Sequence, residues 1–119
     1  MRGLTNRALA WLADRFTADD TKHLATFKKP TNTGAGEVAY YQHGKIVVFS
    51  GTVQLTGNVS SGTILFDDMP TVSSTIVAFR VNNSSTGNMY DFYVNGTTIR
   101  NVGSCPSGWY RLSGAYVTT

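Results

Sequence analysis

The chain is poor in cysteine, charge and long apolar runs. Cys105 is the single cysteine among 119 residues, which excludes an intrachain disulfide and a zinc site built from the cysteines of one chain. Only 14% of the residues are charged, against about 25% in an average domain. No apolar run reaches the roughly 18 residues of a membrane span, and Asp14 interrupts the N-terminal run before a signal peptide forms. We therefore expect a soluble, unprocessed chain without membrane insertion.

Serine, threonine and asparagine take the place of the missing charges. They account for 34 of the 119 residues, beside 12 glycines, and they favour turns and extended chain over helix interiors. With 41% apolar and 12% aromatic residues, the composition is that of a folded chain, which excludes intrinsic disorder. The length suits one domain with its own core. The composition predicts a small β domain.

Residues 1–30 differ from the rest of the chain. Apolar residues recur at spacings of three and four from Leu4 to Phe27, which predicts a short amphipathic helical segment that ends before Pro30. So short a helix needs a partner surface, either the β domain of its own chain or equivalent helices of other chains. The residues expected at this attachment or trimer interface are Leu4, Leu9, Trp11, Leu12, Phe16, Leu24 and Phe27.

Residues 31–36 form a small hinge rich in glycine and threonine, and the periodicity changes after it. Residues 37–119 contain seven stretches rich in Val, Ile, Thr, Tyr and Phe with turn signals between them. The stretches are 38–42, 45–55, 63–66, 75–82, 89–94, 97–101 and 109–117. Asn95 and Gly96 tolerate the positive φ of a two-residue hairpin turn. We expect a mainly β fold, an antiparallel, jelly-roll-like β-sandwich preceded by the helical segment.

Alternation within the stretches predicts which side chains face the core. The predicted inward residues are Val47, Phe49, Val53, Leu55, Val77, Phe79, Val81, Leu112 and Tyr116. Ile46 and Val48 have the opposite parity and are apolar too, so we expect both faces of that strand to be covered. The second cover is the helical segment or a neighbouring subunit. Oligomerisation is therefore a prediction.

Residue types that carry catalysis are sparse after residue 30. The carboxylates in this part are Glu37, Asp67, Asp68 and Asp91. Asp67 and Asp68 are adjacent and point to opposite sides of an extended strand, so we interpret them as turn residues and not as an acid and base pair. His23 and His43 belong to no metal-ligand motif, and phosphate loops and nucleophile motifs are missing. We expect no enzyme activity, no metal and no cofactor.

The net charge of +3 lies in residues 1–30, whereas residues 31–119 have a formal net charge of zero. Nucleic-acid binding depends on basic side chains that displace the counterions of the phosphates. The neutral β domain therefore argues against a nucleic-acid partner, and the basic pI of about 9.2 reflects the N-terminal segment.

Aromatic side chains are the remaining signal. Tyr and Trp beside Asn, Asp and Arg form surfaces that bind proteins or sugars, because they offer an apolar face together with a hydrogen-bonding edge. Adjacent aromatics such as Trp109 and Tyr110 point to opposite sides of a strand, so some of them lie outside the core.

Four motifs follow one another over two-thirds of the chain. They are YQHGKIVVFSGTV (41–53), LFDDMP (65–70), FYVNGTTI (92–99) and GWYRLSGAYV (108–117). In this order and spacing, residues 38–119 resemble the C-terminal receptor-binding (head) domains of bacteriophage tail-fibre and baseplate proteins. The chain departs from the usual pattern after Pro70, where Thr71 stands in place of a second proline.

The resemblance implies a phage virion adhesin, located on the tail fibre, the baseplate or the capsid surface. It implies a homotrimer of non-catalytic heads that recognise a host-envelope saccharide or protein, joined through the N-terminal segment to a stem, baseplate or capsid protein. Sandwich loops group at the ends of the fold, and the receptor-facing residues we expect there are Asn83, Asn88, Tyr90, Asp91, Trp109, Tyr110 and Arg111. One alternative is a purely structural virion component, such as a capsid head fibre or decoration protein. Another is a carbohydrate-binding module detached from an enzyme.

Overall fold

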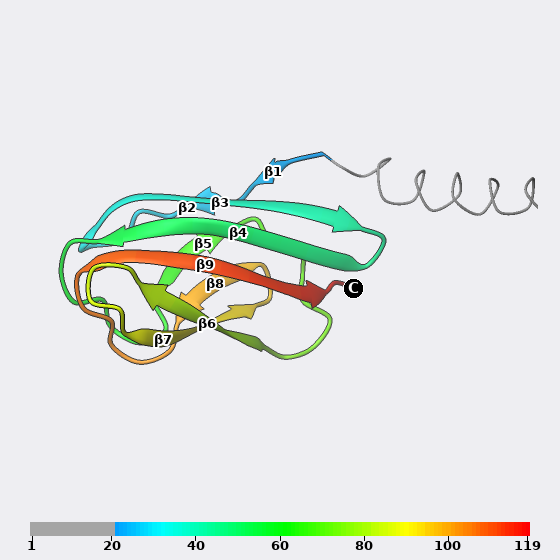
Figure 1. Ribbon diagram of the computed structural model, residues 1–119. Helices are drawn as coiled ribbons and strands as arrows, with labels where there is room; N and C mark the ends of the chain where they lie inside the picture. Colours follow the sequence, from blue (N-terminus) through cyan, green and yellow to red (C-terminus); the bar gives the residue numbers. More distant parts are fainter. Residues whose placement is uncertain (1–20) are drawn as a thin grey trace, which may run out of the picture.

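The computed structural model describes residues 21–119, which form nine antiparallel strands and no helix (Figure 1). The strands are β1 (His23–Leu24), β2 (Thr26–Phe27), β3 (Thr33–His43), β4 (Ile46–Leu55), β5 (Ile64–Asp67), β6 (Val77–Asn83), β7 (Met89–Asn95), β8 (Thr98–Asn101) and β9 (Gly108–Val117). They make one hydrogen-bonded sheet in the order β1-β3-β4-β9-β6-β7-β8-β5-β2. The prediction of a mainly β, antiparallel fold is confirmed.

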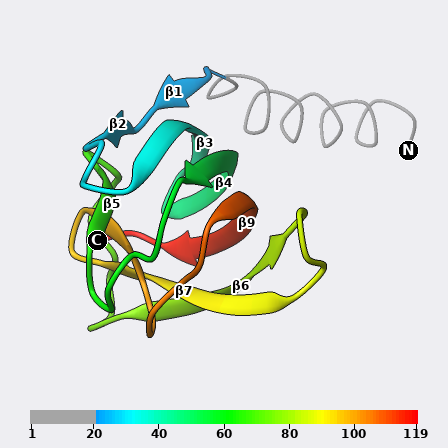
Figure 2. The same ribbon diagram turned by 90° about the vertical axis from the view of Figure 1, so that its left-hand side faces the viewer.

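The sheet curves into a nearly closed barrel (Figure 2). β1 and β2 follow each other directly in the chain, yet β1 pairs with β3 and β2 pairs with β5. The Phe27 ring lies 5.3 Å from the Phe66 ring, between centroids. Instead of two separate sheets there is one, because β9 pairs with β6 through Asn82–Arg111 and Asn83–Tyr110.

The barrel interior holds the apolar core. The predicted inward residues of β4 and β9 are buried, and so is Val81 of β6, whereas Val77 and Phe79 are partly buried against the core. The largest fully buried side chains are Tyr110, Phe66, Phe92, Leu55, Leu65, Ile99, Val38, Val47, Val53, Val81, Val94 and Asn83. The alternation in the sequence therefore identified the inward faces of β4, β6 and β9 correctly.

The predicted β7–β8 hairpin is present, with its turn one residue later than expected. Asn95 pairs with Thr98, so Gly96 and Thr97 are the two turn residues. Gly96 has a φ of 59°, and glycine at the first central position with positive φ is the requirement of a type II′ turn.

Residues 21–30 differ from the prediction, because the expected helix is absent there and residues 23–27 form β1 and β2. Their backbone hydrogen-bonds to the free edges of β3 and β5, as in Ala25 N–H to Val38 O (2.9 Å) and Lys28 N–H to Leu65 O (2.9 Å). These tertiary partners outweigh the weak local preference for helix. The rest of the predicted helix lies outside the described residues.

The predicted hinge also contributes to the sheet. β3 begins at Thr33, and a β-bulge separates Thr33 from Gly36. An ideal Cβ on Gly36 would lie 2.9 Å from the Phe27 ring, so the glycine lets an aromatic side chain pack against the strand. The glycine content of this segment thus serves close packing.

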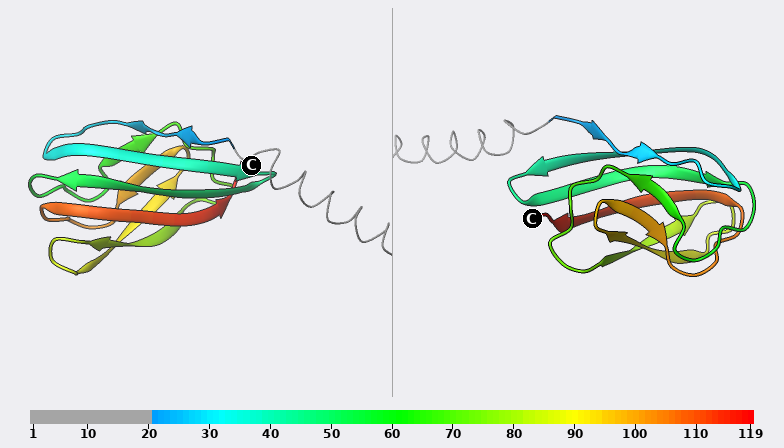
Figure 3. Two further views of the ribbon diagram at one scale, coloured as in Figure 1. Left: turned by 45° about the horizontal axis from the view of Figure 1, so that its top comes forward. Right: turned by 180° about the vertical axis from the view of Figure 1, so that it is seen from behind.

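The barrel has two distinct ends (Figures 1 and 3). What we call the loop end carries loops 28–32, 56–63, 84–88 and 102–107. The opposite end, the terminal end, carries turns 44–45 and 96–97, loop 68–76, the C-terminus and Thr21. The described chain therefore starts and finishes at the same end, and the opposite end is formed by loops alone.

Candidate functional site

The outward face of β4 and β9 changes character along its length. The cross-strand pairs on this face, from the terminal end to the loop end, are Ile46–Val117, Val48–Ala115, Ser50–Ser113, Thr52–Arg111 and Gln54–Trp109. We call the four residues of the first two pairs the apolar strip and the six residues of the last three pairs the polar face. Their neighbours in sequence, such as Val47 and Leu112, point into the core. A single sheet surface thus contains an aliphatic half and a hydrogen-bonding half.

Trp109 and Arg111 dominate the polar face. They stand two residues apart on β9, so both side chains point outward, and 40% of Trp109 is exposed to solvent. Within residues 21–119, the indole N–H of Trp109 has no hydrogen-bond partner and Arg111 forms no ion pair. Asn82 pairs with Arg111 and is also exposed. This surface therefore offers an aromatic ring and unoccupied donors to a ligand.

A groove of about 440 Å³ lies on the same outward side, over β3 and β4. It is lined by Lys22, Glu37, Ala39, Tyr41, Ser50, Gly51 and Thr52. Small residues of β4 form its floor. Lys22 Nζ and Glu37 Oε1 are 3.8 Å apart, and both side chains are more than half exposed. Because these charges compensate each other and the other lining groups are uncharged, the groove suits an uncharged polar ligand.

Four of the seven predicted receptor-facing residues are exposed, namely Asn88, Asp91, Trp109 and Arg111. Asp91 pairs across the strands with Arg80, and its carboxylate lies 3.4 Å from the Arg80 guanidinium. Tyr90 is partly buried and packs edge-on against Tyr110, with ring centroids 5.5 Å apart. The structure therefore places Trp109 and Arg111 together, with Asp91 two strands away.

Asn83 was predicted as a receptor-facing residue, but it is completely buried and holds a loop in place. Its Oδ1 accepts hydrogen bonds from the N–H groups of Ser85 (2.9 Å) and Thr86 (3.3 Å), and its Nδ2 donates to Ser107 O (3.2 Å). The neighbouring Ser84 N–H donates to Trp109 O (2.8 Å). Asn83 thus ties loop 84–88 to the start of β9, where it positions Trp109.

Tyr110 is also buried, which corrects its predicted contact with a receptor. Its hydroxyl donates to Pro106 O (2.7 Å), and the ring stacks on Phe92 with centroids 5.8 Å apart. Burial, the largest cause, raises the pKa of Tyr110 to about 12. The Tyr110 side chain is therefore part of the core beneath the polar face.

Replacing Tyr110 with phenylalanine should change the alkaline stability of the protein. The pKa of Tyr110 is higher in the folded state than its ordinary value of 10.0, so the neutral phenol stabilises the fold below pH 10, and this contribution is lost as the pH rises through about 12. Tyr110→Phe cannot ionise, and we expect its free energy of unfolding to fall less steeply between pH 10 and pH 12. Denaturant unfolding at several pH values measures this, and parallel pH profiles would contradict it.

The predicted interface residues fall into two groups. Leu24 is 59% exposed and pairs with Ala39 on the outward side, which is compatible with an interface. Phe27 packs on Phe66 within its own chain, so its burial needs no second subunit. Leu4, Leu9, Trp11, Leu12 and Phe16 lie outside the described residues.

Asp67 and Asp68 hold the turn after β5, as predicted from their spacing. The Thr97 hydroxyl (2.7 Å) and the Asp68 N–H (2.7 Å) both donate to Asp67 Oδ1, and these bonds lower the pKa of that carboxyl. Thr26 donates its hydroxyl to Asp68 Oδ2 (2.6 Å). The part of the chain that the structure describes contains no cluster of His, Cys, Asp and Glu side chains suited to a metal ion.

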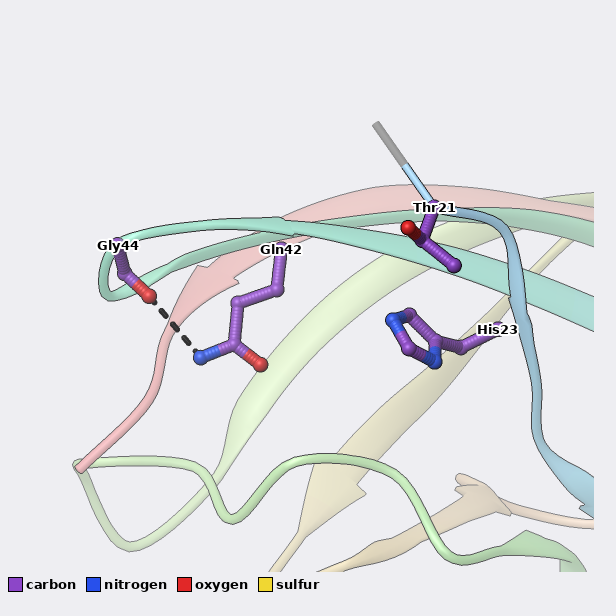
Figure 4. A pocket seen from close by; sticks show the side chains of 4 residues that line it. All are labelled: Thr21, His23, Gln42 and Gly44. Carbon is purple, nitrogen blue, oxygen red and sulfur yellow. Dashed lines mark hydrogen bonds between the residues drawn. The ribbon is translucent and has the colours of Figure 1, made fainter. Parts of the chain in front are cut away.

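A second hollow, of about 240 Å³, opens at the terminal end between Thr21, His23, Gln42 and Gly44 (Figure 4). Gln42 Nε2 donates to Gly44 O (2.9 Å), so the side-chain amide of Gln42 already has a hydrogen-bond partner within the chain. The His23 ring stacks on Tyr40 with centroids 5.1 Å apart. The groove on β3 and β4 is larger than this hollow and is lined by more hydroxyl groups, so it is the stronger candidate.

Comparisons with known proteins add no assignment. No protein-family model matches the chain, and no curated protein is significantly similar to it in sequence. Among residues 21–119, no helix has the length and apolar character required to cross a membrane.

Proposed function

We propose that the protein is a phage virion adhesin whose β head, as a homotrimer, binds a host-envelope saccharide without catalysis. The proposal rests on the exposed side chains of Trp109 and Arg111, whose polar groups have no partner within the described chain. They lie beside a groove lined with hydroxyl groups. An indole ring packs against the apolar face of a sugar, and the surrounding donors and acceptors bind its hydroxyl groups. The resemblance of the sequence motifs to those of phage head domains supports the same function.

The arrangement of the two ends supports attachment to a virion. Thr21 and the C-terminus lie at the terminal end, so the preceding segment can join a stem, baseplate or capsid protein without covering the loop end. We interpret the barrel as a flattened, jelly-roll-like sandwich, with β3, β4 and β9 as one layer and β5 to β8 as the other. In this arrangement Trp109, at the start of β9, lies near the exposed loops.

A purely structural virion component is the second candidate function. The apolar strip favours it, since exposed aliphatic patches mark contacts between proteins. In that case the aromatic and polar side chains would only complete subunit contacts. The two functions differ in one measurable property, the binding of a glycan by the isolated protein.

Replacing Trp109 with alanine should weaken receptor binding at least tenfold, because a central aromatic contact contributes about 2 kcal/mol or more to binding. The measurement is binding of the purified full chain to an array of bacterial envelope glycans and to bacterial cells. Val102→Ala is the matched control, because Val102 is 47% exposed on a loop at the same end and lies off the polar face.

Two results would contradict the proposal. The first is that the folded wild-type protein binds neither glycans nor cells. The second is that Trp109→Ala and Val102→Ala bind equally well, both with unchanged circular dichroism. The first result would favour the structural component, and the second would move the binding surface elsewhere.

A further inference from the structure

Four aliphatic side chains form a continuous exposed surface at the terminal end. Ile46 is 53% exposed, Val48 44% and Val117 51%, and Ala115 is exposed between them. The direct cross-strand pairs Ile46–Val117 and Val48–Ala115 place all four on one face. Scattered exposed apolar residues need no explanation, but a contiguous patch on a sheet face marks a contact with another protein.

We propose that the apolar strip is the surface through which copies of this chain contact one another. This inference rests on the homotrimer of the proposed function and names the contact surface of that trimer. The strip carries no charge, and the flanking Ser50 and Ser113 are neutral, so identical strips can meet without repulsion between like charges. β-branched and small aliphatic side chains also leave a flat surface, which suits contact between identical sheets.

The size of the strip and the position of Thr21 favour a second copy as the occupant. Stable interfaces bury roughly 800 Å² on each partner, which is more than four small side chains supply, so further surface must take part. Twenty residues precede Thr21, which lies at the same end of the barrel as the strip, before β1 and two strands from β4 in the sheet order. Several apolar residues among them, including Leu9 and Leu12, were predicted to associate between chains, which would add the required area.

A fold-back of the same segment is the competing occupant. β1 runs from the terminal end towards the loop end, since it is antiparallel to β3. A segment that precedes Thr21 would have to reverse its direction at that residue to cover the strip of its own chain. Contact between copies requires no such reversal.

The polar face begins where the strip ends, between Val48 and Ser50. When copies meet through the strip, the groove and Trp109 therefore remain at the rim of the contact, open to a ligand. Self-association and glycan binding thus use separate parts of one sheet surface and can be tested separately.

The test compares two glutamate substitutions on one strand and one face of the full chain. Val48→Glu places a negative charge in the strip. Thr52→Glu places the same charge in the polar face, two outward-facing positions further along β4. By sedimentation equilibrium we expect wild type and Thr52→Glu to have three times the chain mass of 12.9 kDa, whereas Val48→Glu sediments as a single chain. Circular dichroism and thermal melting verify that both variants are folded.

Thiol labelling tests whether a second copy of the chain covers the strip. Cys105 is buried, so the introduced thiol of Val48→Cys is the accessible one, and we expect its alkylation to be at least tenfold slower in the assembled protein than in the same variant diluted to monomer. A monomeric wild type, whether its strip is protected or not, would overturn the inference. If Val48→Glu is still a trimer, the inference that the apolar strip is the contact surface is wrong, although the protein still assembles as a trimer. Glycan binding, measured on the wild-type protein, tests the proposed function independently.

Discussion

Replacing Gly51 with alanine is expected to destabilise the protein by about 3 kcal/mol, the upper range for overpacking. Gly51 lies on β4 opposite Val38 of β3. An ideal Cβ on Gly51 would collide with the Glu37 carbonyl oxygen and lie 2.7 Å from Val38 Cα. Both are backbone atoms, so relief requires β3 to move away from β4, which disrupts the pairing that also forms the groove. Denaturant unfolding measures the loss.

Gly44→Ala is the matched control for this substitution. Gly44 has a φ of 62°, and within residues 21–119 no atom beyond its two chain neighbours lies within 4 Å of an ideal Cβ there. This variant therefore incurs only the cost of a left-handed backbone, about 1–2 kcal/mol. We expect the Gly51→Ala loss to exceed it. An equal loss in the two variants would mean that β3 adjusts to the added methyl group, contrary to the close approach described above.

Replacing Asn83 with alanine is expected to reduce the free energy of unfolding by about 2–3 kcal/mol, since the buried side chain forms three part-buried hydrogen bonds of about 1 kcal/mol each. The N–H group of Ser85 and the carbonyl of Ser107 would lose this partner, whereas the N–H group of Thr86 would keep its contact with the backbone carbonyl of residue 83 (3.3 Å). Chemical denaturation followed by fluorescence measures the loss. Because Trp109 lies beside this network, its emission reports on the same region.

Asn82→Ala is the control for Asn83→Ala. The two asparagines are adjacent in sequence, but Asn82 is exposed and its side chain makes no hydrogen bond within the described chain. Exposed substitutions of this kind change stability by no more than about 0.5 kcal/mol. If Asn82→Ala were as destabilising as Asn83→Ala, the assignment of Asn83 as the residue that positions loop 84–88 would be wrong. A glycan-binding loss in Asn82→Ala alone would instead extend the polar face onto β6.

The two buried residues in the predicted receptor set could have been recognised from the sequence. Val77, Phe79 and Val81 were assigned to the inward face, and the same alternation continues to Asn83. It likewise extends back from Leu112 to Tyr110. Both were assigned to the surface because they lie beside loops and have a polar or aromatic side chain, although buried polar groups are common where hydrogen bonds satisfy them. Strand parity was the better guide to position than side-chain polarity.

Other features were not accessible to local patterns. The spacing of apolar residues around Leu24 and Phe27 fits a helix, but the free edges of β3 and β5 decide their conformation, and those edges exist only in the folded sheet. The pairing of β9 with both β4 and β6 is equally non-local. Sequence alone therefore predicted strands β3 to β9 and the inward faces of β4, β6 and β9, but it did not reveal β1, β2, the closed sheet or the groove on its surface.

The pairing of residues 23–27 with both edges of the sheet determines where the β domain can be cut. A fragment that begins at Glu37 would lose β1, β2 and the start of β3, and it would uncover the edge of β3 at Ala39 and Tyr40 and the edge of β5 at Phe66 and Asp67. Uncovered strand edges are templates for edge-to-edge aggregation. The barrel and its N-terminal flank are therefore one folding unit, and a soluble head must start no later than Lys22.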